Sequence, residues 1–380
     1  MSEWKDFSLE ELGDILNHKR IPLSSMERQQ RKGKYPYFGA SGIIDYVDDF
    51  LFDGEHVLIS EDGENLKSRQ TPIAFIANGK FWVNNHAHII KGKSSNINKL
   101  LVYYFHNLDL NPYLTGAVQP KLNKAALVSI PISLPKDENE QTAIAEVLSS
   151  LDDKIDLLHR QNKTLEQLAE TLFRQWFVEE AEEGWEVGKI EDVCKQISSG
   201  GTPPTRIEAY YNGDINWYST KELNDNFLFE SKSKITKEGL ENSSAKIFPE
   251  NTILIAIYAA PTVGRLGILT NEAACNQAAC GFIVNEERVS FEYLYLHLYT
   301  SRQRLNDMAS GSAQQNLNVR IMKEFEIVIP PIKAHENFRD QVRPMFKKIK
   351  SNTQQIRTLT QLRDTLLPKL MSGEVRVDAI

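Results

Sequence analysis

The feature that most constrains this chain is a heptad pattern between Gln141 and Phe177. Apolar residues there recur alternately four and three positions apart for five heptads, without Gly or Pro, and only Asn162 interrupts them. Such a pattern indicates a long helix with one apolar edge that must pack against another helix. The apolar positions are Ile144, Leu148, Leu151, Ile155, Leu158, Leu165, Ala169, Leu172 and Trp176.

A second heptad pattern, from Phe338 to Leu370, offers the partner helix, with Asn352 and Arg363 at seam positions. In an antiparallel pair the numbers of facing residues have a constant sum, and one register matches every seam residue, placing Asn162 against Asn352. An unpaired buried amide costs about 1–3 kcal/mol, so we expect the two to hydrogen-bond and fix the register. Two unrelated amphipathic helices are the alternative.

Charge is distributed unevenly along the chain. Residues 136–184 carry a net charge of −8 and residues 331–380 of +5, whereas residues 1–135 are neutral and residues 185–330 carry −4. An acidic and a basic helix suit a coiled-coil pair. Because neither globular part is basic overall, binding to DNA would require local basic patches.

The chain is a tandem repeat. Residues 116–123 match residues 311–318, residues 132–135 match residues 327–330, and residues 164–172 match residues 358–366, all at nearly the same offset. The predicted order is a globular unit, a long helix, a second globular unit and a second long helix. The corresponding boundaries are 1–135, 136–184, 185–330 and 331–380.

Short strands and few helices are predicted in each globular unit. Apolar β-branched runs predict strands at residues 57–60, 73–77 and 88–90, and at residues 252–258 and 280–284. Helices are predicted at residues 100–106 and 291–300. The fold class is therefore α+β: two mixed α/β units separated by two long helices that form an antiparallel coiled coil, with pseudo-two-fold repetition.

Composition favours a cytoplasmic protein. No apolar run approaches the roughly 20 residues that span a bilayer, and the first residues do not resemble a signal peptide. Three cysteines (Cys194, Cys275 and Cys280) form no even disulfide framework, as expected in a reducing compartment.

Motifs for catalysis are incomplete. Residues 110–113 (LNPY) approach the Asn-Pro-Pro-Tyr motif of amino-methyltransferases but lack one Pro, and no Gly-rich cofactor loop precedes them. No Walker A motif or Pro-Asp pair occurs. His86 and His88 could ligate a metal from one face of a strand, but a half-buried polar pair is the stronger interpretation because no cysteine or carboxylate cluster accompanies them. No catalytic residue and no metal site are predicted.

Several motifs together resemble one family. They are Pro135 followed by Glu140-Gln141, residues 172–177 (LFRQWF), residues 200–203 (GGTP) with Tyr210-Tyr211, and residues 366–373 (LLPKLMSG). Over nearly its whole length the chain resembles a specificity (S) subunit of a type I restriction–modification system. Glu336-Asn337 departs from the Glu-Gln that opens the first long helix.

The resemblance implies a division of labour. Residues 1–135 and 185–330 would be target-recognition domains, each reading half of a bipartite DNA site. Residues 136–184 and 331–380 would be conserved helical regions that bind two methyltransferase (M) subunits, with restriction (R) subunits in the full complex. This chain would bind no cofactor: S-adenosylmethionine belongs to the M subunit, and ATP and Mg to the R subunit. The implied M-subunit interface is Phe173, Trp176, Phe177, Leu367, Leu370 and Met371.

Candidate DNA contacts lie in polar loops. Aligning Leu58 with Leu254 places Arg69 opposite Arg265, each in a loop after an apolar strand. Guanidinium and amide groups suit base edges and phosphates. The candidates are Arg28, Arg31, Lys34, Tyr37, Lys67, Arg69, Gln70, Thr202, Arg206, Tyr218, Lys221 and Arg265. An ordinary solvated side chain is the alternative at each position. Gln119 and Gln314 recur in both halves, which favours a shared structural role for their loops.

Two other functional classes compete with this interpretation. A complete nuclease or methyltransferase would need the missing catalytic motifs. A bivalent protein–protein scaffold that does not bind DNA would need none of them, and it is the main alternative.

Overall fold

The computed structural model describes residues 3–116, 119–181, 184–258, 262–310 and 316–377. Two compact units emerge. Unit 1 comprises Met1–Asp156 and Thr358–Ile380, and unit 2 comprises Leu157–Arg357. No helix among the described residues is long and apolar enough to span a bilayer.

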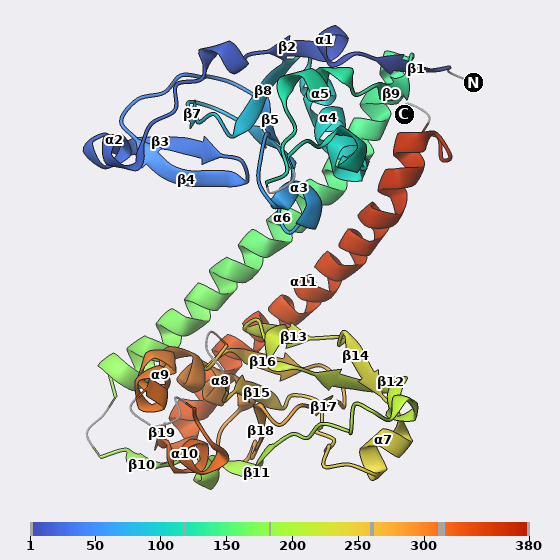
Figure 1. The fold of residues 1–380 in the computed structure, drawn as a ribbon. Coiled ribbons are helices and arrows are strands. Elements are labelled where there is room, and N and C mark those ends of the chain that lie inside the picture. The colour runs from blue at the N-terminus through green and yellow to red at the C-terminus, as the bar shows by residue number, and fades with distance from the viewer. Residues whose placement is uncertain (1–2, 117–118, 182–183, 259–261, 311–315, 378–380) are drawn as a thin grey trace. The chain divides into compact units, whose positions relative to one another are not determined.

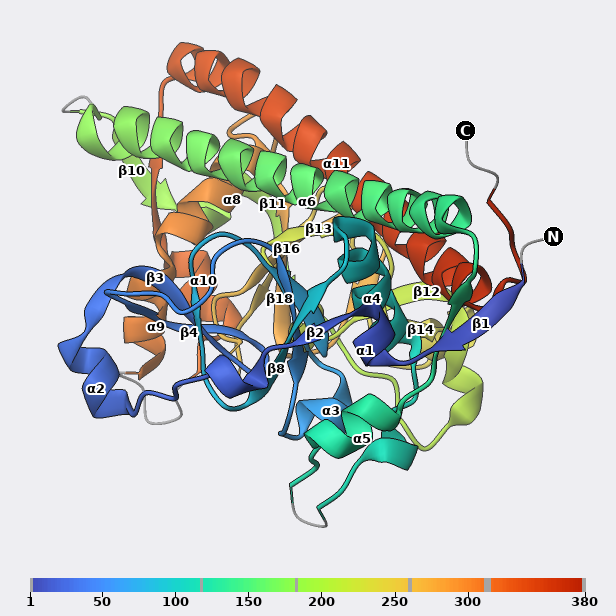
Figure 2. The ribbon, with the colours of Figure 1, turned by 90° about the horizontal axis from the view of Figure 1, so that it is seen from above.

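Two long helices dominate the chain. Helix α6 runs from Glu138 to Arg174 and ends in a π-helical turn, Gln175–Glu179, and α11 runs from Ile332 to Ser372. Both views show them side by side (Figures 1 and 2). They form the predicted antiparallel coiled coil, so the α+β fold class is confirmed. Seam residues such as Leu148 in unit 1 and Val342 in unit 2 are fully buried.

Unit 1 is built on a four-stranded sheet of order β2-β8-β5-β6. Central strand β5 is buried along its whole length because its apolar run has no polar face. Helix α4 (Ser95–Asn107), capped by Ser94, lays buried Leu100, Leu101 and Phe105 onto the core. The sheet strands are β2 (Gly13–Ile15), β8 (Ala87–Gly92), β5 (His56–Ser60) and β6 (Ala74–Ala77).

Smaller elements complete unit 1. A three-stranded sheet has the order β4-β3-β7, and β1 pairs with β9. These strands are β1 (Trp4–Phe7), β3 (Lys32–Gly39), β4 (Gly42–Val47), β7 (Trp82–Val83) and β9 (Ile132–Pro135). The short helices are α1 (Leu9–Leu12), α2 (Ser25–Gln30), α3 (Asn65–Ser68) and α5 (Lys124–Ser129).

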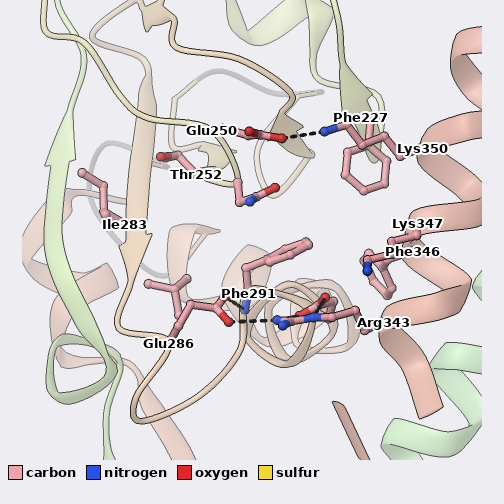
Figure 3. Close-up of a pocket in the computed structure, with 13 residues that line it drawn as sticks. Phe227, Glu250, Thr252, Ile283, Glu286, Phe291, Arg343, Phe346, Lys347 and Lys350 are labelled. Atoms are coloured by element: carbon pink, nitrogen blue, oxygen red, sulfur yellow. Dashed lines mark hydrogen bonds and ion pairs between the residues drawn. The ribbon is translucent and has the colours of Figure 1, made fainter. Parts of the chain in front are cut away.

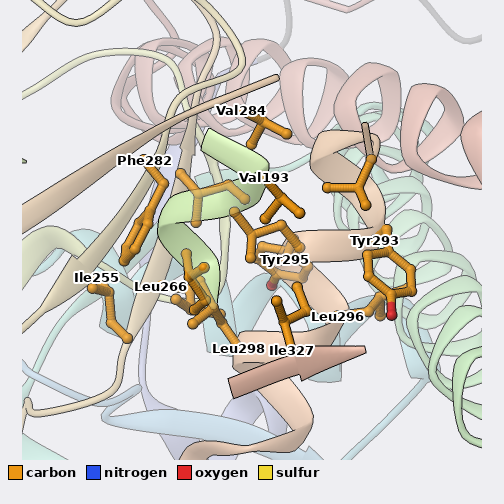
Figure 4. Packing of buried hydrophobic residues seen from close by; sticks show 14 of the residues in the cluster. Val193, Ile255, Leu266, Phe282, Val284, Tyr293, Tyr295, Leu296, Leu298 and Ile327 are labelled. Atoms are coloured by element: carbon orange, nitrogen blue, oxygen red, sulfur yellow. The ribbon is translucent and has the colours of Figure 1, made fainter. Parts of the chain in front are cut away.

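Unit 2 repeats this plan with a five-stranded sheet of order β11-β18-β15-β16-β13. Helix α8 (Phe291–Thr300), capped by Ser290, packs Tyr293, Leu296 and Leu298 into the core (Figure 4). The sheet strands are β11 (Cys194–Ser199), β18 (Ala279–Val284), β15 (Ile253–Ala256), β16 (Leu266–Leu269) and β13 (Asn226–Leu228).

The remaining elements of unit 2 also mirror unit 1. A three-stranded sheet has the order β14-β12-β17, and β10 pairs with β19. These strands are β10 (Glu186–Lys189), β12 (Tyr211–Tyr218), β14 (Ser233–Ile235), β17 (Ala274–Cys275) and β19 (Glu326–Ile329). The other helices are α7 (Lys237–Glu241), α9 (Arg302–Ser310) and α10 (Val319–Glu324).

The duplicated motif at residues 116–123 and 311–318 ends in a helix cap. Asn123 accepts a hydrogen bond from the Ala126 amide at 2.9 Å, and Asn318 accepts one from the Ile321 amide at 2.9 Å. Both asparagines therefore begin a short helix, α5 or α10. Gln314 lies outside the described residues.

Candidate DNA-reading loops

Four loops of unit 1 meet at one end of its central sheet. We call residues 16–20, 61–73, 84–86 and 119–122 the loop edge of unit 1. The Glu61 amide donates to His86 O at 2.8 Å, and the Leu122 amide donates to Glu61 O at 2.8 Å. Backbone hydrogen bonds thus hold three of the loops together without using side chains.

A largely buried polar cluster fastens the fourth loop. Arg20 Nη1 donates to Glu61 Oε2 at 2.6 Å and to Ala87 O at 2.8 Å. His88 is fully buried; its Nε2 donates to Leu122 O at 2.7 Å, and its Nδ1 accepts from Asn17 at 2.8 Å. Burial lowers the pKa of His88, so the ring is neutral and structural.

The two histidines do not form the expected half-buried pair. His86 lies in an exposed turn before β8, and its Nδ1 is 2.9 Å from Asp62 Oδ1, whereas only His88 lies in the strand. The prediction that both histidines lie on one face of a strand failed because the strand begins one residue after His86. Within the described residues, no group of three His, Cys, Asp or Glu side chains could hold a metal ion.

Unit 2 has a loop edge of the same construction, formed by residues 200–204, 224–226, 262–265 and 276–278. The Asn276 amide donates to Tyr218 O at 2.9 Å, just as the Asn84 amide donates to Phe38 O at 3.0 Å in unit 1. The Gly201 amide donates to Cys275 O at 2.9 Å. The two units therefore present loops on equivalent backbone frames.

Strand register corrects the predicted equivalence of Arg69 and Arg265. The Ser60 amide donates to Ile73 O at 2.8 Å, and the equivalent Ala256 amide donates to Arg265 O at 2.9 Å. Arg265 thus occupies the position of Ile73. The first loop is longer by four residues (61–73 against 257–265), and an alignment anchored on one flanking strand could not detect this difference.

Arg69 is used within unit 1. Its backbone is left-handed (φ 48°, ψ 35°), and its guanidinium donates to His106 O at 2.8 Å and also to Leu108 O. Both acceptors lie at the end of α4. Arg69 therefore anchors its loop to α4, while its neighbours Lys67 and Gln70 remain exposed.

Comparison with known proteins gives these loops a context. The family model for the type I restriction modification DNA specificity domain matches residues 1–167 and 182–361. The chain belongs to this family. It is a specificity subunit of a type I restriction–modification system, a non-catalytic component whose two recognition domains read a bipartite DNA site.

Related proteins match most or all of this chain. The MjaIX type I restriction enzyme specificity subunit of Methanocaldococcus jannaschii is 26% identical, covering 100% of this chain and 95% of its own. A Haemophilus influenzae protein, provisionally described as a type I restriction enzyme specificity subunit, is 32% identical over 87% of this chain and 84% of its own. The crystal structure of an S subunit from M. genitalium has the same fold (TM-score 0.69, 15% identity, 97% of this chain and 96% of that one).

Two tyrosines predicted to contact DNA lie in the core of this specificity subunit. Tyr37 and Tyr218 are 0% and 2% exposed. The Tyr37 hydroxyl accepts from the Leu23 amide at 2.9 Å, and burial raises the pKa of Tyr218. Because both rings are buried, we assign them a structural role and leave them out of the proposed DNA contacts: in a polar stretch of sequence, a core tyrosine looks the same as an exposed one.

The arginines beside the β3–β4 hairpin are paired internally. Arg28 donates to Asp45 at 3.2 Å and lies over the Tyr37 ring, and Arg31 donates to Asp48 at 2.9 Å and lies over Trp82. Lys34 is exposed. The hairpin cations are thus largely neutralised by acidic neighbours.

The remaining candidate residues of unit 2 differ in the exposure and hydrogen bonding of their side chains. Thr202 donates a hydrogen bond to Gln277 Oε1, whereas Arg206 and Lys221 are exposed and Arg265 is half-buried. Sequence reasoning missed the exposed turn residues Asn85, His86 and Gln277. Matching residues 84–86 (NNH) with residues 276–278 (NQA) would have revealed them, because the same turn precedes β8 and β18.

Four residues predicted to bind the M subunit are core residues. Phe173 and Phe177 are 2% and 4% exposed, and Leu370 and Met371 are 1% and 5% exposed. The Phe173 ring lies 5.4 Å from that of Tyr293 in unit 2. Because their side chains face the interior of this chain, we assign these four to its core and leave them out of the proposed M-subunit interface. Trp176 and Leu367 are half-buried.

A cavity of about 420 Å³ in unit 2 lies against α11 (Figure 3). Ion pairs line it: Arg343 is 2.7 Å from Glu292 and 2.8 Å from Glu286, and Lys350 is 2.6 Å from Glu250. Because acidic and basic groups neutralise one another there, the cavity is a poor phosphate site.

Proposed function

We propose that the two loop edges are the surfaces with which this specificity subunit reads DNA, unit 1 contacting one half-site and unit 2 the other. Residues 1–135 and 185–330 are then the recognition domains. One observation carries this proposal: equivalent backbone frames present different exposed side chains, Asn85 and His86 in one turn and Gln277 in the other. A shared frame with different side chains is what two domains need to read different sequences.

The side chains of the loop edges and their surroundings suit distinct kinds of contact. Amides such as Gln70 and Gln277 can pair with adenine edges, and the Arg265 guanidinium with guanine. Exposed Lys34, Lys67, Arg206 and Lys221 are suited to phosphates, which position the protein without reading sequence. Arg28, Arg31 and Arg69 are tied to neighbouring groups and would act by shaping their loops.

The helical regions, residues 136–184 and 331–380, are the proposed docking site for two M subunits, with half-buried Trp176 and Leu367 at the interface. The M subunits would supply S-adenosylmethionine and the methylation chemistry. R subunits, with ATP and Mg, would complete the restriction complex. The whole assembly would act on DNA in the cytoplasm.

Reconstitution tests this assignment. The chain alone should show no methylation, cleavage or ATPase activity, yet should direct site-specific methylation when mixed with its M subunits and S-adenosylmethionine. Methylation mapped across the genome, with and without this chain, would give the bipartite sequence. The alternative function, a bivalent protein scaffold, requires that the methylation pattern be indifferent to this chain.

The coiled coil is proposed to set the spacer between half-sites. Inserting one heptad into α6 and one into α11, at facing positions, preserves the seam and lengthens each helix by about 10 Å at about 1.5 Å per residue. The preferred spacer should grow by about three base pairs at about 3.4 Å each, as read from methylation mapping. An unchanged spacer with both half-sites retained would refute the ruler role.

A further inference from the structure

At the polar exceptions in the heptad seams, side-chain hydrogen bonds lead from the coiled coil toward the recognition domains. We propose that Arg302 with Asp225 in unit 2, and Arg69 in unit 1, are positioning residues that hold each DNA-reading loop at a fixed place on its part of the coil. The inference rests on the proposed function of the loop edges. It assigns a specificity role to residues that need not touch DNA.

The path in unit 2 begins at the seam asparagines. Asn352 Nδ2 donates to Asn162 Oδ1 at 2.9 Å, and Asn162 Nδ2 donates to Thr353 Oγ1 at 3.2 Å. The Thr353 hydroxyl lies 3.2 Å from Asn226 Oδ1 and 2.8 Å from Ile349 O, so it can donate to either acceptor. Asn226 opens β13 at the loop edge.

Asp225 continues the path in a strained conformation. Its backbone is left-handed (φ 62°), which costs energy for a residue other than Gly and persists only where contacts determine it. The Asp225 amide donates to Leu266 O at 2.8 Å, and the Leu266 amide donates to Asp225 Oδ1 at 2.9 Å. Tyr295 Oη donates to Asp225 O at 2.8 Å. Asp225 is thereby locked to the first residue of β16.

Arg302 joins Asp225 to the candidate reading loop. Its guanidinium binds the Asp225 carboxylate through two nitrogens, Nη1 at 3.0 Å and also Nη2, while Nε donates to Gly264 O at 2.9 Å. The Tyr299 ring supports the guanidinium at 5.0 Å. A planar guanidinium held at three donors fixes both direction and distance, which a lysine could not reproduce. Gly264 immediately precedes Arg265.

Unit 1 also links its loop to a helix through an arginine, but there the arginine lies on the loop and the acceptor lies on the helix. Arg363, a seam exception, donates to Asp152 Oδ1 at 2.8 Å, and Tyr103 Oη of α4 donates to Asp152 Oδ2 at 2.7 Å. One turn further, at the C-terminal end of α4, Arg69 of the loop donates to His106 O. His106 follows its cap Ser94 at the same distance as Arg302 follows Ser290. We call this arginine-mediated link between loop and helix the clamp. It lies at the same place in both units, but the arginine belongs to the loop in unit 1 and to the helix in unit 2.

The test uses the chain in complex with its M subunits and measures methylation rates on the cognate site and on sites with one base changed in either half. Arg302→Gln should lower discrimination at the half-site of unit 2 about tenfold and leave the other half-site unchanged. Arg69→Gln should do the reverse. Arg302→Lys and Asp225→Asn, which keep size and part of the hydrogen bonding, should give losses of about threefold.

Matched controls separate positioning from folding. Arg320→Gln removes a highly exposed ion pair with Glu324 in unit 2, and Lys5→Gln removes a surface pair with Glu11 in unit 1. Both should leave discrimination unchanged. If Arg302→Gln fails to fold, the two conservative variants decide, since they should keep the melting temperature while losing discrimination. Equal losses at both half-sites, or none in any clamp variant, would overturn the inference.

Failure of the inference can be told apart from failure of the proposed function. Gln277→Ala and Arg265→Ala remove side chains of the loop edge itself, one exposed and one half-buried. If these two alter the unit 2 half-site and the clamp variants do not, only the positioning role is wrong. If Gln277→Ala and Arg265→Ala change nothing, the loop edge does not read DNA and both ideas fail together.

Discussion

Units 1 and 2 share a frame but attach it to the coil differently. In unit 1 the longer loop carries its own arginine, Arg69, and grips the carbonyl end of α4. In unit 2 the shorter loop is gripped from outside by Arg302 of α9. Duplication has thus preserved backbone register and helix caps, while the side chains that join loop to helix were exchanged between the partners.

The parts of the coil that belong to each unit also differ. In unit 1 the seam exception Arg363 forms an ion pair with Asp152, and both side chains are about one-third exposed. In unit 2 the exception is a buried amide pair, and farther along the helices lies an aromatic cluster of Phe173, Phe177 and Phe338. Unit 2 should therefore depend more on packing and on uncharged groups than unit 1, and three perturbations test this contrast.

The largest effect is expected from Phe173→Ala. The ring is buried and contacts Phe177, Tyr293 and Phe338, so its loss should destabilise unit 2 by about 3–5 kcal/mol. Chemical unfolding of the isolated chain measures this directly. The control is Leu168→Ala on the same helix, whose side chain is 45% exposed and should cost little. A normal unfolding curve for Phe173→Ala, with impaired binding of the M subunit, would restore the original interface interpretation.

The second-largest effect is expected from acid, which should lower the folding stability of unit 2. Burial lowers the pKa of His335 to about 4, and its Nε2 accepts a hydrogen bond from the Ser290 amide at 2.9 Å, which a protonated ring could not do. Between about pH 6.5 and 4 the unfolded chain binds the extra proton, so stability falls as pH falls, by up to roughly 3 kcal/mol for this group.

Unfolding by denaturant at pH 7.5 and pH 5 measures this loss. His335→Gln can still accept the Ser290 hydrogen bond and should make unit 2 less sensitive to pH. His159→Gln, at an exposed position of α6, should not. The same pH dependence in His335→Gln as in the parent chain would show that other groups, such as His297, whose pKa burial also lowers to about 4, control the response.

These examples show what sequence could predict. The seams and their pairing followed from a one-dimensional period, which survives without knowledge of loops, and the strands followed from apolar runs. Arg69 and Arg265 were mismatched because a four-residue difference in loop length is visible only in strand register. The burial of Tyr37, Tyr218 and Phe173 could not be predicted, because aromatic residues are enriched both in cores and at interfaces and only the structure separates the two.

The smallest and most diagnostic effect concerns the seam amides. Asn352 and Asn162 are 0% and 4% exposed and share a 2.9 Å hydrogen bond, as the constant-sum pairing expects. Asn162→Leu or Asn352→Leu alone leaves one buried amide facing an aliphatic side chain, at a cost of about 1–3 kcal/mol. The double variant replaces both partners and should be nearly neutral. A double-mutant cycle from denaturant unfolding measures this coupling, and additive losses would mean that the pair does not act as a unit.

The same double variant also separates stability from positioning. Its seam is aliphatic throughout, so the coil should stay paired, but Thr353 loses the amide that orients it toward Asn226. If the seam amides serve only the register, methylation of both half-sites should continue with unchanged discrimination. If they also begin the path through Asp225 and Arg302, discrimination at the half-site of unit 2 alone should weaken, by less than in Arg302→Gln because the clamp itself remains. The equivalent change in unit 1 is Arg363→Met, which should weaken discrimination only at the half-site of unit 1. The effect should be partial, since Asp152 keeps its hydrogen bond from Tyr103.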